Sequence, residues 1–258
     1  MKAIPSACRT QAPSKCPRGC ARDFKHWAFS LGLSAASFER LAAEWQNDVY
    51  APGDSLFRQG DRPSCIYFVH TGRVKLVRSE STDRRRIVRL ISGPSILGEL
   101  ALIAGQPYAS TGKVLEEASI CRIEAARFQE LWGSDPELPR FFARLLAKRL
   151  GESDEAGSDL ALRSIRERVA KLILCCEEAS GAPGAPVSLG LSRQDLAQGR
   201  GTGPEVVSRT IASLAANRLI SVDGRMVLVL ERVRLRQAAG ITSIIPNNNF
   251  RHCQFGMP

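Results

Sequence analysis

Residues 191–220 read LSRQDLAQGRGTGPEVVSRTIASLAANRLI, and this stretch decides the architecture of the 258-residue chain. Ser192 is followed three residues later by Asp195, an acidic variant of the capping box that begins a helix. Gly199 and Gly201 then supply turn positions at which a positive φ costs little. A second helical pattern follows these glycines. The stretch therefore predicts two short helices joined by a glycine-bearing turn.

The polar face of the second helix, which Pro204 suits as a first residue, fits the recognition of bases. Glu205, Ser208 and Arg209 fall at spacings of three and four residues, so they share one face. Glutamate can accept from cytosine, arginine can bind two acceptors of guanine, and serine is adaptable. Such a Glu–Arg spacing also occurs as a surface ion pair, but the capped helix and the turn favour a helix-turn-helix that reads DNA. The predicted DNA-contacting residues are Glu205, Ser208, Arg209, Thr202 and Arg193.

The rest of the chain divides around this motif. Asp223-Gly224 lies between two β-prone runs, a strong hairpin signal that predicts a wing beside the second helix. From Val49 to Ile123, short apolar strands alternate with turn signals, which indicates a β-sandwich or barrel. The predicted parts are an irregular cysteine-bearing arm at residues 1–24, a β domain at 25–135, a long helix at 136–163, a winged helix-turn-helix domain at 164–240 and a tail at 241–258.

Composition limits the class of protein. The hydrophobic content of 44% and the charged content of 24% are typical of soluble globular proteins. The net charge of +10 and the pI near 9.6 fit a polyanionic partner. No apolar run approaches the roughly 20 residues that span a bilayer, and the first residues lack a secretory signal, so we expect a cytoplasmic protein without a membrane partner. Eight cysteines in such a protein favour reduced thiols or metal ligation over disulfides.

The long helix at 136–163 carries an apolar stripe of helical period. The stripe is too apolar for an exposed connector between two domains. Burial against the β domain would explain it, and so would pairing with the same helix of a second subunit. The residues alone leave both explanations open.

Two sets of residues together carry a family resemblance. The first set comprises Pro52-Gly53-Asp54, Gly60-Asp61, Gly72 and the run LGELAL at 97–102. The second set is the run EVVSR at 205–209. With these sets in this order, about residues 25–235 resemble the CRP/FNR family of bacterial transcription regulators. The resemblance implies an α+β fold with an N-terminal β-roll sensor domain like those that bind cyclic nucleotides, a long dimerisation helix and a C-terminal winged helix-turn-helix.

The resemblance extends to a DNA target and to a homodimer. The Glu-x-x-Ser-Arg pattern is similar to the recognition helix of the FNR branch, which implies a palindrome of TTGAT-like half-sites. Under this hypothesis Arg209 pairs with the guanine, Glu205 with a cytosine of the complementary strand and Ser208 with a thymine. Two such helices in a symmetric dimer would enter major grooves about 34 Å apart. The implied dimer contacts are Leu138, Phe142, Leu145, Leu146 and Leu150.

Three classes of signal compete for the sensor domain, and the first is a cyclic nucleotide. Gly98-Glu99 resembles the pair in that pocket, where backbone amides and an arginine hold the cyclic phosphate. Tyr108 stands where the cyclic-AMP-binding members carry this arginine, and a buried phosphate without a cationic partner is costly. The resemblance therefore argues against cyclic AMP, and we interpret Gly98 and Glu99 as turn and scaffold residues.

The second class of signal acts through an iron–sulfur cluster. The candidate ligands are Cys8, Cys16 and Cys20 in the arm and Cys121 in the last predicted strand. They resemble the set in the FNR branch, where three N-terminal cysteines and a central one hold an oxygen-labile [4Fe–4S] cluster. The spacing differs, since C-x7-C-x3-C stands in place of C-x2-C-x5-C. We predict a [4Fe–4S] cluster that senses oxygen or redox state, with the alternative that Cys121 is a small apolar residue filling the roll.

The third class is haem or direct thiol chemistry. His70 precedes the Thr71-Gly72 turn, and we interpret it as a polar turn residue rather than a haem ligand. Thiols beside the basic residues of the arm could respond to oxidants without a metal. Bare thiols or a nucleotide-like effector in the β-roll are thus the alternatives to a cluster. A cysteine-based redox enzyme is a remote alternative, because the chain has no C-x-x-C, nucleophile elbow or P-loop, and we predict no enzyme.

A highly charged loop at 78–86 joins two predicted strands of the β domain. In the family this loop can touch RNA polymerase, which makes the polymerase an expected partner. A solvated hairpin tip is the alternative interpretation, since runs of charge are often exposed faces. The predicted polymerase contacts are Arg84, Arg85 and Arg86.

Three further cysteines are interpreted as structural. Cys65 begins a predicted strand and should be buried there. Cys175 and Cys176 continue the apolar run of a helix between the long helix and the helix-turn-helix. Because neighbouring side chains diverge around a helix, at most one of this pair should face the core squarely.

Overall fold

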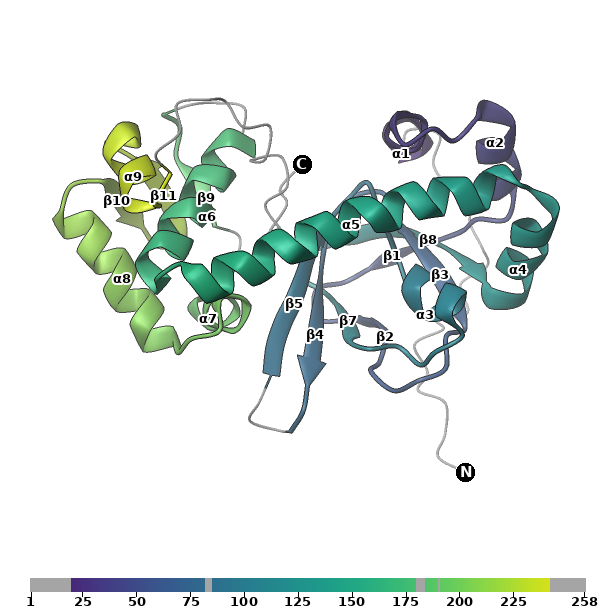
Figure 1. The fold of residues 1–258 in the computed structure, drawn as a ribbon, viewed down its shortest axis with the longest axis horizontal. Helices are drawn as coiled ribbons and strands as arrows, with labels where there is room; N and C mark the ends of the chain where they lie inside the picture. The colour runs from purple at the N-terminus through teal and green to yellow at the C-terminus, as the bar shows by residue number, and fades with distance from the viewer. Residues whose placement is uncertain (1–19, 82–84, 180–183, 190, 242–258) are drawn as a thin grey trace. The chain divides into compact units, whose positions relative to one another are not determined.

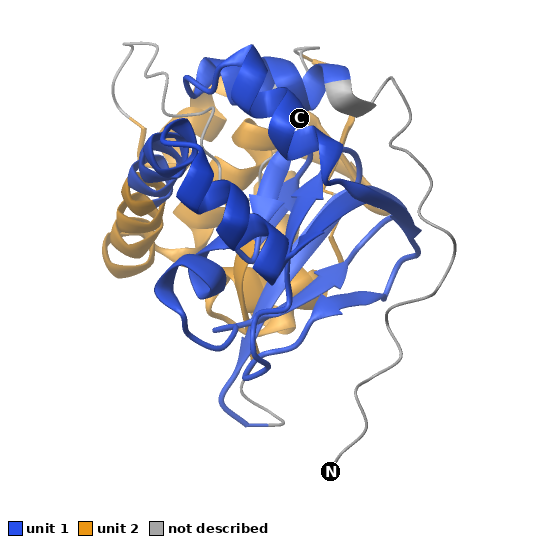
Figure 2. Cartoon of the chain, turned by 90° about the vertical axis from the view of Figure 1, so that its right-hand side faces the viewer, with its two compact units in different colours: residues 1–82, 90–149 blue, residues 83–89, 150–258 orange. Residues whose placement is uncertain are grey.

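The computed structural model describes residues 20–81, 85–179, 184–189 and 191–241. The predictions that concern Cys8, Cys16, Arg84, the side chain of Cys20 and the tail after residue 241 lie outside this described part. The chain splits into two compact units, coloured separately in Figure 2. Unit 1 comprises Met1–Thr82 and Leu90–Arg149, and unit 2 comprises Asp83–Arg89 and Leu150–Pro258.

Unit 1 is built around two four-stranded sheets (Figure 1). The first sheet has the order β1 (Gln46–Tyr50), β8 (Ala118–Glu124), β3 (Cys65–Val69) and β6 (Ser95–Leu97). The second has the order β2 (Ser55–Phe57), β7 (Thr111–Val114), β4 (Arg73–Ser79) and β5 (Arg85–Ser92), whose first residues fall in unit 2. The helices are α1 (Cys20–Ser30), α2 (Ala35–Ala43), α3 (Glu99–Ala104), α4 (Ala125–Ser134) and the first half of α5 (Glu137–Leu162). This arrangement confirms the predicted β-roll and the α+β class.

Strand β3 is buried on both faces because a different layer covers each one. Ile66 and Phe68 belong to a core shared with α1, α2, α4 and α5. Tyr67 and Val69 belong to a second core, which lies inside the roll. Successive strand residues alternate between faces, so the run CIYFV serves both cores at once. We call the first of these the helix-side core and the second the roll core.

Helix α1 begins at Cys20, so the prediction of an irregular arm up to residue 24 was wrong for its last residues. Phe24 is fully buried, with its ring centroid 5.0 Å from that of Trp27 and 5.6 Å from that of Phe68. These aromatic contacts supply the core that an isolated arm would lack. From Cys20 onward the chain is therefore anchored on the helix-side core.

The long helix α5 buries part of its apolar stripe inside unit 1. Leu138, Phe142 and Leu145 are at most 3% exposed and belong to the helix-side core. Their prediction as dimer contacts was wrong, because side chains packed inside one domain are not available to a second subunit. Burial against the β domain explains these three residues. Leu146 is half-buried and Leu150 is exposed, so these two stay predicted dimer contacts.

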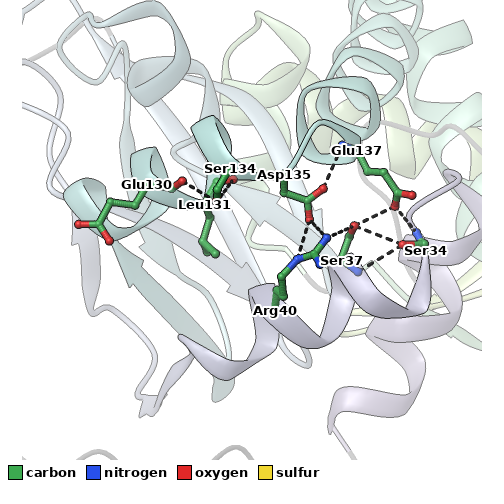
Figure 3. A network of polar contacts seen from close by, with 8 residues as sticks. All are labelled: Ser34, Ser37, Arg40, Glu130, Leu131, Ser134, Asp135 and Glu137. Carbon is green, nitrogen blue, oxygen red and sulfur yellow. Dashed lines mark hydrogen bonds and ion pairs between the residues drawn. The ribbon is translucent and has the colours of Figure 1, made fainter.

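Polar contacts join helix α2 to the start of α5 (Figure 3). The N–H of Ser34 and the hydroxyl of Ser37 donate to Glu137 Oε2, at 3.2 and 2.8 Å. The Arg40 guanidinium donates to Asp135 Oδ2, at 2.7 Å from Nη2. Asp135 Oδ1 in turn accepts the N–H of Glu137 at 3.0 Å, which satisfies a backbone donor in the first turn of α5. The network fixes where α5 begins relative to α2.

The two carboxylates make this network sensitive to acid. Burial raises the pKa of Asp135, but hydrogen bonds with Arg40 and Ser37 outweigh burial and hold that pKa below its ordinary value. Hydrogen bonds from Ser34 and Ser37 likewise lower the pKa of Glu137. A pKa that is lower in the folded state stabilises the fold above the ordinary value of about 4, and this stabilisation is lost as the pH falls through the lowered value.

We expect Asp135→Asn to lower the free energy of unfolding at pH 7 by about 1.5–3 kcal/mol, the range for hydrogen bonds to a charged group. The difference from the unchanged protein should shrink as the pH falls from about 5 to 2, where Asp135 itself becomes protonated. Urea unfolding at a series of pH values measures both effects. Glu130→Gln is the control, because Glu130 is 63% exposed and its ion pair with Arg127 lies on the surface. Equal losses at pH 7 in the two variants would contradict the prediction.

Unit 2 is a three-stranded sheet with helices packed around α6. Its elements after α5 are α6 (Ile165–Ala179), β9 (Val187–Ser188), α7 (Arg193–Arg200), α8 (Pro204–Ala216), β10 (Ile220–Asp223), β11 (Met226–Val229) and α9 (Arg232–Ala238). The sheet order is β10-β11-β9, and β10 pairs antiparallel with β11 across Gly224, whose φ is +57°. The predicted wing is thereby confirmed. Within the described ranges, no helix is long and apolar enough to cross a membrane.

Helix α6 buries both of its cysteines. Cys175 is 4% exposed and Cys176 is 3% exposed, so the prediction that at most one of them faces the core squarely was wrong. Helix α6 contacts α8 and α9 as well as β9 and β11, so its sides as well as its inner face are covered. In unit 1, Cys65 is buried at the first position of β3, as predicted.

Candidate nucleic-acid interface and sensor core

The helix-turn-helix forms through the local signals of its sequence. Ser192 is the N-cap of α7: its Oγ accepts the N–H of Asp195 at 3.0 Å and donates to Asp195 Oδ2 at 2.9 Å. Gly201 ends α7 with a φ of +66°, and α8 starts at Pro204, both as predicted. Gly199 lies inside α7 rather than in the turn, which corrects its predicted role. Of the two predicted turn glycines, Gly201 alone has a positive φ in the turn.

Helix α8 separates a buried face from an exposed one. The buried face comprises Val207, Ile211 and Leu214. Glu205, Ser208 and Arg209 are all exposed in the first half of the helix, so the structure brings these three together. Thr202 in the preceding turn and Arg193 at the start of α7 are half-buried. Among the described residues no ion pair joins Glu205 to Arg209, which leaves both side chains available to a partner.

Gly203 makes room for the Glu205 carboxylate at the start of α8. A Cβ atom at Gly203 would lie 3.0 Å from Glu205 Oε2, tighter than most real contacts. Gly203 is also the N-cap residue, with Pro204 as the first helical residue. A larger side chain at 203 would therefore displace the carboxylate of Glu205, a predicted DNA contact.

Arg168 of α6 binds the carboxyl end of α7, where the turn begins, and this role was not predicted from the sequence. It is 8% exposed, and its Nη1 donates to the carbonyl oxygen of Arg200 at 2.7 Å. A cation at the carboxyl end of α7 is favourable for the helix dipole. Burial and the nearby charge of Arg200 lower the pKa of Arg168. An arginine within the otherwise apolar face of a helix was the available sequence signal.

Aromatic side chains fill the roll core around Tyr108. Tyr108 is 4% exposed and stacks on Phe57, with ring centroids 4.2 Å apart. Its hydroxyl donates to the carbonyl oxygen of Cys65 at 2.8 Å, and burial raises its pKa to about 12. Tyr67 also packs near Phe57, at a centroid distance of 5.6 Å. Tyr108 therefore serves packing and offers no charge to a phosphate.

Glu99 is a scaffold residue with a specific partner. It is the first residue of α3, follows Gly98 with its φ of +85°, and is 3% exposed. Its carboxylate accepts from Arg149 of α5, which is itself 8% exposed. Arg149 also donates to the carbonyl oxygen of Ile96 at 2.6 Å. The buried ion pair joins α5 to the α3 region of the roll.

Cys121 is the described member of the predicted cluster ligands. It is fully buried in the helix-side core, and its thiol donates to Asn47 Oδ1 at 3.5 Å. Ser119 donates to the same Asn47 oxygen at 3.2 Å. No group of three or more potential metal ligands occurs among the described residues, a set that excludes the arm cysteines. Cys121 thus shares the Asn47 acceptor with Ser119, although its own side chain belongs to an apolar core.

His70 and Trp45 lie in the same core. His70 is 5% exposed, which corrects its interpretation as a polar turn residue. Its ring centroid lies 4.8 Å from that of Trp45 and 5.4 Å from that of Phe24. Trp45 Nε1 is a buried donor without a hydrogen-bond partner. Of the predicted cluster ligands, the described side chains thus supply the Cys121 thiol alone, which is fully buried and bonded to Asn47.

Two of the three predicted polymerase contacts, Arg85 and Arg86, lie among the described residues. Both are exposed as the first two residues of strand β5, as a protein-contact surface or a solvated tip requires. Both explanations from the sequence therefore remain consistent with the exposed side chains.

Two family models match the chain in the order of its domains. Residues 48–135 match the cyclic nucleotide-binding domain, and residues 167–238 match the Crp-like helix-turn-helix domain. A CRP-like cAMP-activated global transcriptional regulator of Mycobacterium tuberculosis is 24% identical over 211 residues, which cover 81% of this chain and 94% of that protein. The CRP-like protein Clp of Xanthomonas campestris is 26% identical over 208 residues, which cover 78% of this chain and 90% of Clp. These relatives are regulators rather than enzymes.

Solved structures show the same fold. The c-di-GMP responsive global regulator CLP of Xanthomonas campestris aligns with a TM-score of 0.67 at 24% identity, covering 76% of this chain and 99% of CLP. FixK2 of Bradyrhizobium japonicum aligns with a TM-score of 0.66 at 21% identity, covering 75% of this chain and 96% of FixK2. Matched sensor and helix-turn-helix domains, in this order and within relatives aligned over most of their length, show that the chain belongs to the CRP/FNR family of bacterial transcription regulators.

Proposed function

We propose that this DNA-binding transcription regulator recognises, as a homodimer, a palindrome of TTGAT-like half-sites. The observation that carries the proposal is the joint exposure of Glu205, Ser208 and Arg209 on one face of α8, behind a capped α7 and beside a wing. Arginine binds guanine through two acceptors, glutamate accepts from cytosine, and serine is small enough to sit against thymine. Arg209 is thus assigned to the guanine, Glu205 to a cytosine and Ser208 to a thymine.

A palindrome requires two copies of this surface. Leu150 is 64% exposed on α5, and Leu146 one turn earlier is half-buried, so these two side chains can pack against the same helix of a second subunit. A two-fold dimer would place the two α8 helices in successive major grooves. Binding-site selection from random DNA tests the assignment: we expect a palindrome with an essential guanine in each half-site. Selection of a single asymmetric site would contradict both the dimer and the assignment.

The proposed signal acts through a [4Fe–4S] cluster held by Cys8, Cys16, Cys20 and Cys121. When bound, such a cluster supplies a redox- and oxygen-sensitive group. Cys121 lies in the helix-side core, and α1, which begins at Cys20, is anchored on that core through Phe24. Ligation by the four cysteines would order the arm on the sheet, because three ligands belong to the arm and one to β8. An arm ordered in this way would favour the dimeric, DNA-binding state.

We expect Cys121→Ser to lose the cluster and to bind DNA about 5- to 150-fold more weakly than the loaded unchanged protein, the usual range of coupling between two sites. Anaerobic absorption spectra with iron and sulfide assays measure the first effect. Binding to the selected palindrome measures the second, and light scattering reports the mass of each form. Because serine and cysteine are similar in size, the fold should be kept.

Cys65→Ser is the matched control, since Cys65 is also buried in β3 of the first sheet but belongs to the roll core. It should keep both the cluster and the affinity. Iron-free unchanged protein whose DNA binding responds to oxidants would favour bare thiols as the sensor. Iron-free protein that responds only to a small molecule would favour an effector in the roll.

RNA polymerase is the proposed second partner, through the exposed Arg85 and Arg86. Two exposed arginines at the start of a strand can attract an acidic surface through their charge. Replacing both by alanine should leave DNA affinity unchanged and reduce transcription from a promoter that carries the palindrome. Unchanged transcription would assign the pair to solvation alone.

A further inference from the structure

The joint between the long helix α5 and helix α6 is two residues long. Helix α5 ends at Leu162 and α6 begins at Ile165, so residues 163 and 164 connect them. Ser164 caps α6 reciprocally: its Oγ accepts the N–H of Glu167 at 3.3 Å, and Glu167 Oε2 accepts the N–H of Ser164 at 2.7 Å. This cap fixes where α6 begins. The direction of α6 relative to the last turns of α5 is left to contacts between their side chains.

Lys171 of α6 holds two carboxylates of α5. Its Nζ lies 2.6 Å from Asp159 Oδ2 and 2.9 Å from Glu155 Oε1. These two acidic residues are one turn apart, so a single ammonium group binds one face of α5 over a full turn. The side chains of Lys171 and Asp159 are each 15% exposed, and charges attract each other more strongly there than at an open surface. Burial lowers the pKa of Lys171, but the hydrogen bonds to Asp159 and Glu155 outweigh burial and raise that pKa.

Asp159 is the centre of this network because both of its carboxylate oxygens are used. Its Oδ1 accepts from Arg163 Nε at 2.7 Å, and Arg163 Nη1 donates to the carbonyl oxygen of Ala239 at 2.5 Å. Ala239 is buried at the end of α9. A Cβ atom at the following Gly240 would lie 2.9 Å from Arg163 Nη1, so this close approach requires glycine. Asp159 thus joins α5 to α6 through Lys171 and to the end of α9 through Arg163.

The end of α5 also lies beside the turn of the helix-turn-helix. A Cβ atom at Gly201 would lie 3.8 Å from Leu160 Cδ2, an ordinary packing distance. Leu160 directly follows Asp159 on α5, and α6 in turn contacts α8. A change in the direction of α6 relative to the end of α5 would therefore move α8, and Arg209 with it.

We propose that Asp159 is a positioning residue that sets which spacing of the two half-sites the dimer accepts. This inference rests on the homodimer and the palindrome of the proposed function. In such a dimer each α8 is tied through α6 to the α5 of its own subunit, so the direction of α6 decides how far apart the two α8 helices lie. One added base pair moves a half-site by about 3.4 Å and turns it by about 35° around the DNA axis. A firmly held α6 therefore favours one spacing, and a loosely held one accepts several.

Asp159→Asn tests the proposal, because asparagine keeps the size of the side chain and removes its charge. Fluorescence anisotropy measures the affinity for the selected palindrome, for palindromes with one base pair more or fewer between the half-sites, and for a duplex with one intact half-site. We expect the ratio of the affinities for the best and the next-best spacing to fall at least about fivefold, the lower end of the usual coupling between two sites. The affinity for the single half-site should stay unchanged, since the variant leaves the exposed face of α8 intact.

Two further variants surround this measurement. Lys171→Met breaks the same contact from α6 and should lower the ratio as Asp159→Asn does, whereas Lys171→Arg keeps a cation opposite Asp159 and should retain the preference. Asp154→Asn is the matched control, because Asp154 is an exposed aspartate of the same helix. It should bind every duplex as the unchanged protein does.

An Asp159→Asn variant that keeps the spacing preference overturns the inference. So does a variant that binds the single half-site as weakly as the palindrome, because Asp159 would then serve the fold of the domain alone. An unchanged protein that has no preferred spacing, or that light scattering shows to bind as a monomer, overturns the palindrome and the dimer of the proposed function, and the inference falls with them.

Discussion

Replacing Arg209 with alanine will abolish most of the preference of this regulator for its palindrome. A bidentate arginine–guanine contact provides about 1–3 kcal/mol of discrimination, and a symmetric dimer makes two of them. The expected loss is therefore about 2–6 kcal/mol, or between roughly 30-fold and 10⁴-fold in affinity. The structure supports a direct effect on DNA, because Arg209 is exposed on α8 and lies opposite the buried face that holds the helix in place.

Fluorescence anisotropy at one fixed salt concentration measures this loss against the selected palindrome and against a scrambled duplex. Salt has to be fixed because phosphate contacts make every affinity salt-dependent. Arg209→Ala should weaken binding to the palindrome strongly and to the scrambled duplex only slightly. Arg234→Ala is the control, since Arg234 is an exposed arginine of α9 and carries the same charge on another helix. If Arg209→Ala weakened both duplexes to the same extent, Arg209 would be a phosphate contact instead.

The parts of this fold that the sequence predicts are those set by local chemistry. Ser192 with Asp195 marks the start of α7, Pro204 marks the start of α8, and Asp223-Gly224 marks the turn of the wing. Each signal acts within a few residues, through a cap, a fixed φ or a turn that favours glycine. The candidate DNA-contacting face could therefore be assigned before any packing was known.

The parts that the sequence does not predict depend on contacts between distant segments. An apolar stripe on α5 looks the same whether it packs on its own domain or on a second subunit, and only the structure shows Leu138, Phe142 and Leu145 inside unit 1. His70 follows a strand and precedes a turn, which is typical of an exposed residue. It is buried because Phe24, forty-six residues earlier, packs against it.

The ion pair between Glu99 and Arg149 is the clearest case of such a distant contact, and it supports the second large prediction. Fifty residues separate the partners, and nothing in the run LGELAL identifies an arginine on another helix. We expect Arg149→Met to destabilise the protein by about 3–5 kcal/mol, because it leaves the Glu99 carboxylate buried without a counter-charge. Methionine keeps most of the side-chain volume, so the lost charge rather than a cavity dominates the effect.

The double variant Glu99→Leu with Arg149→Met separates charge from packing. Replacing both partners of a buried ion pair by apolar residues is often neutral or stabilising, so the double variant should recover most of the stability that the single variant loses. At about 2–4 °C per kcal/mol for a chain of this size, the single variant should melt roughly 6–20 °C lower. Thermal unfolding followed by circular dichroism measures both variants. If the double variant were as unstable as the single one, the hydrogen bonds of Arg149 to Ile96 and Ser95, rather than its charge on Glu99, would hold α5 in place.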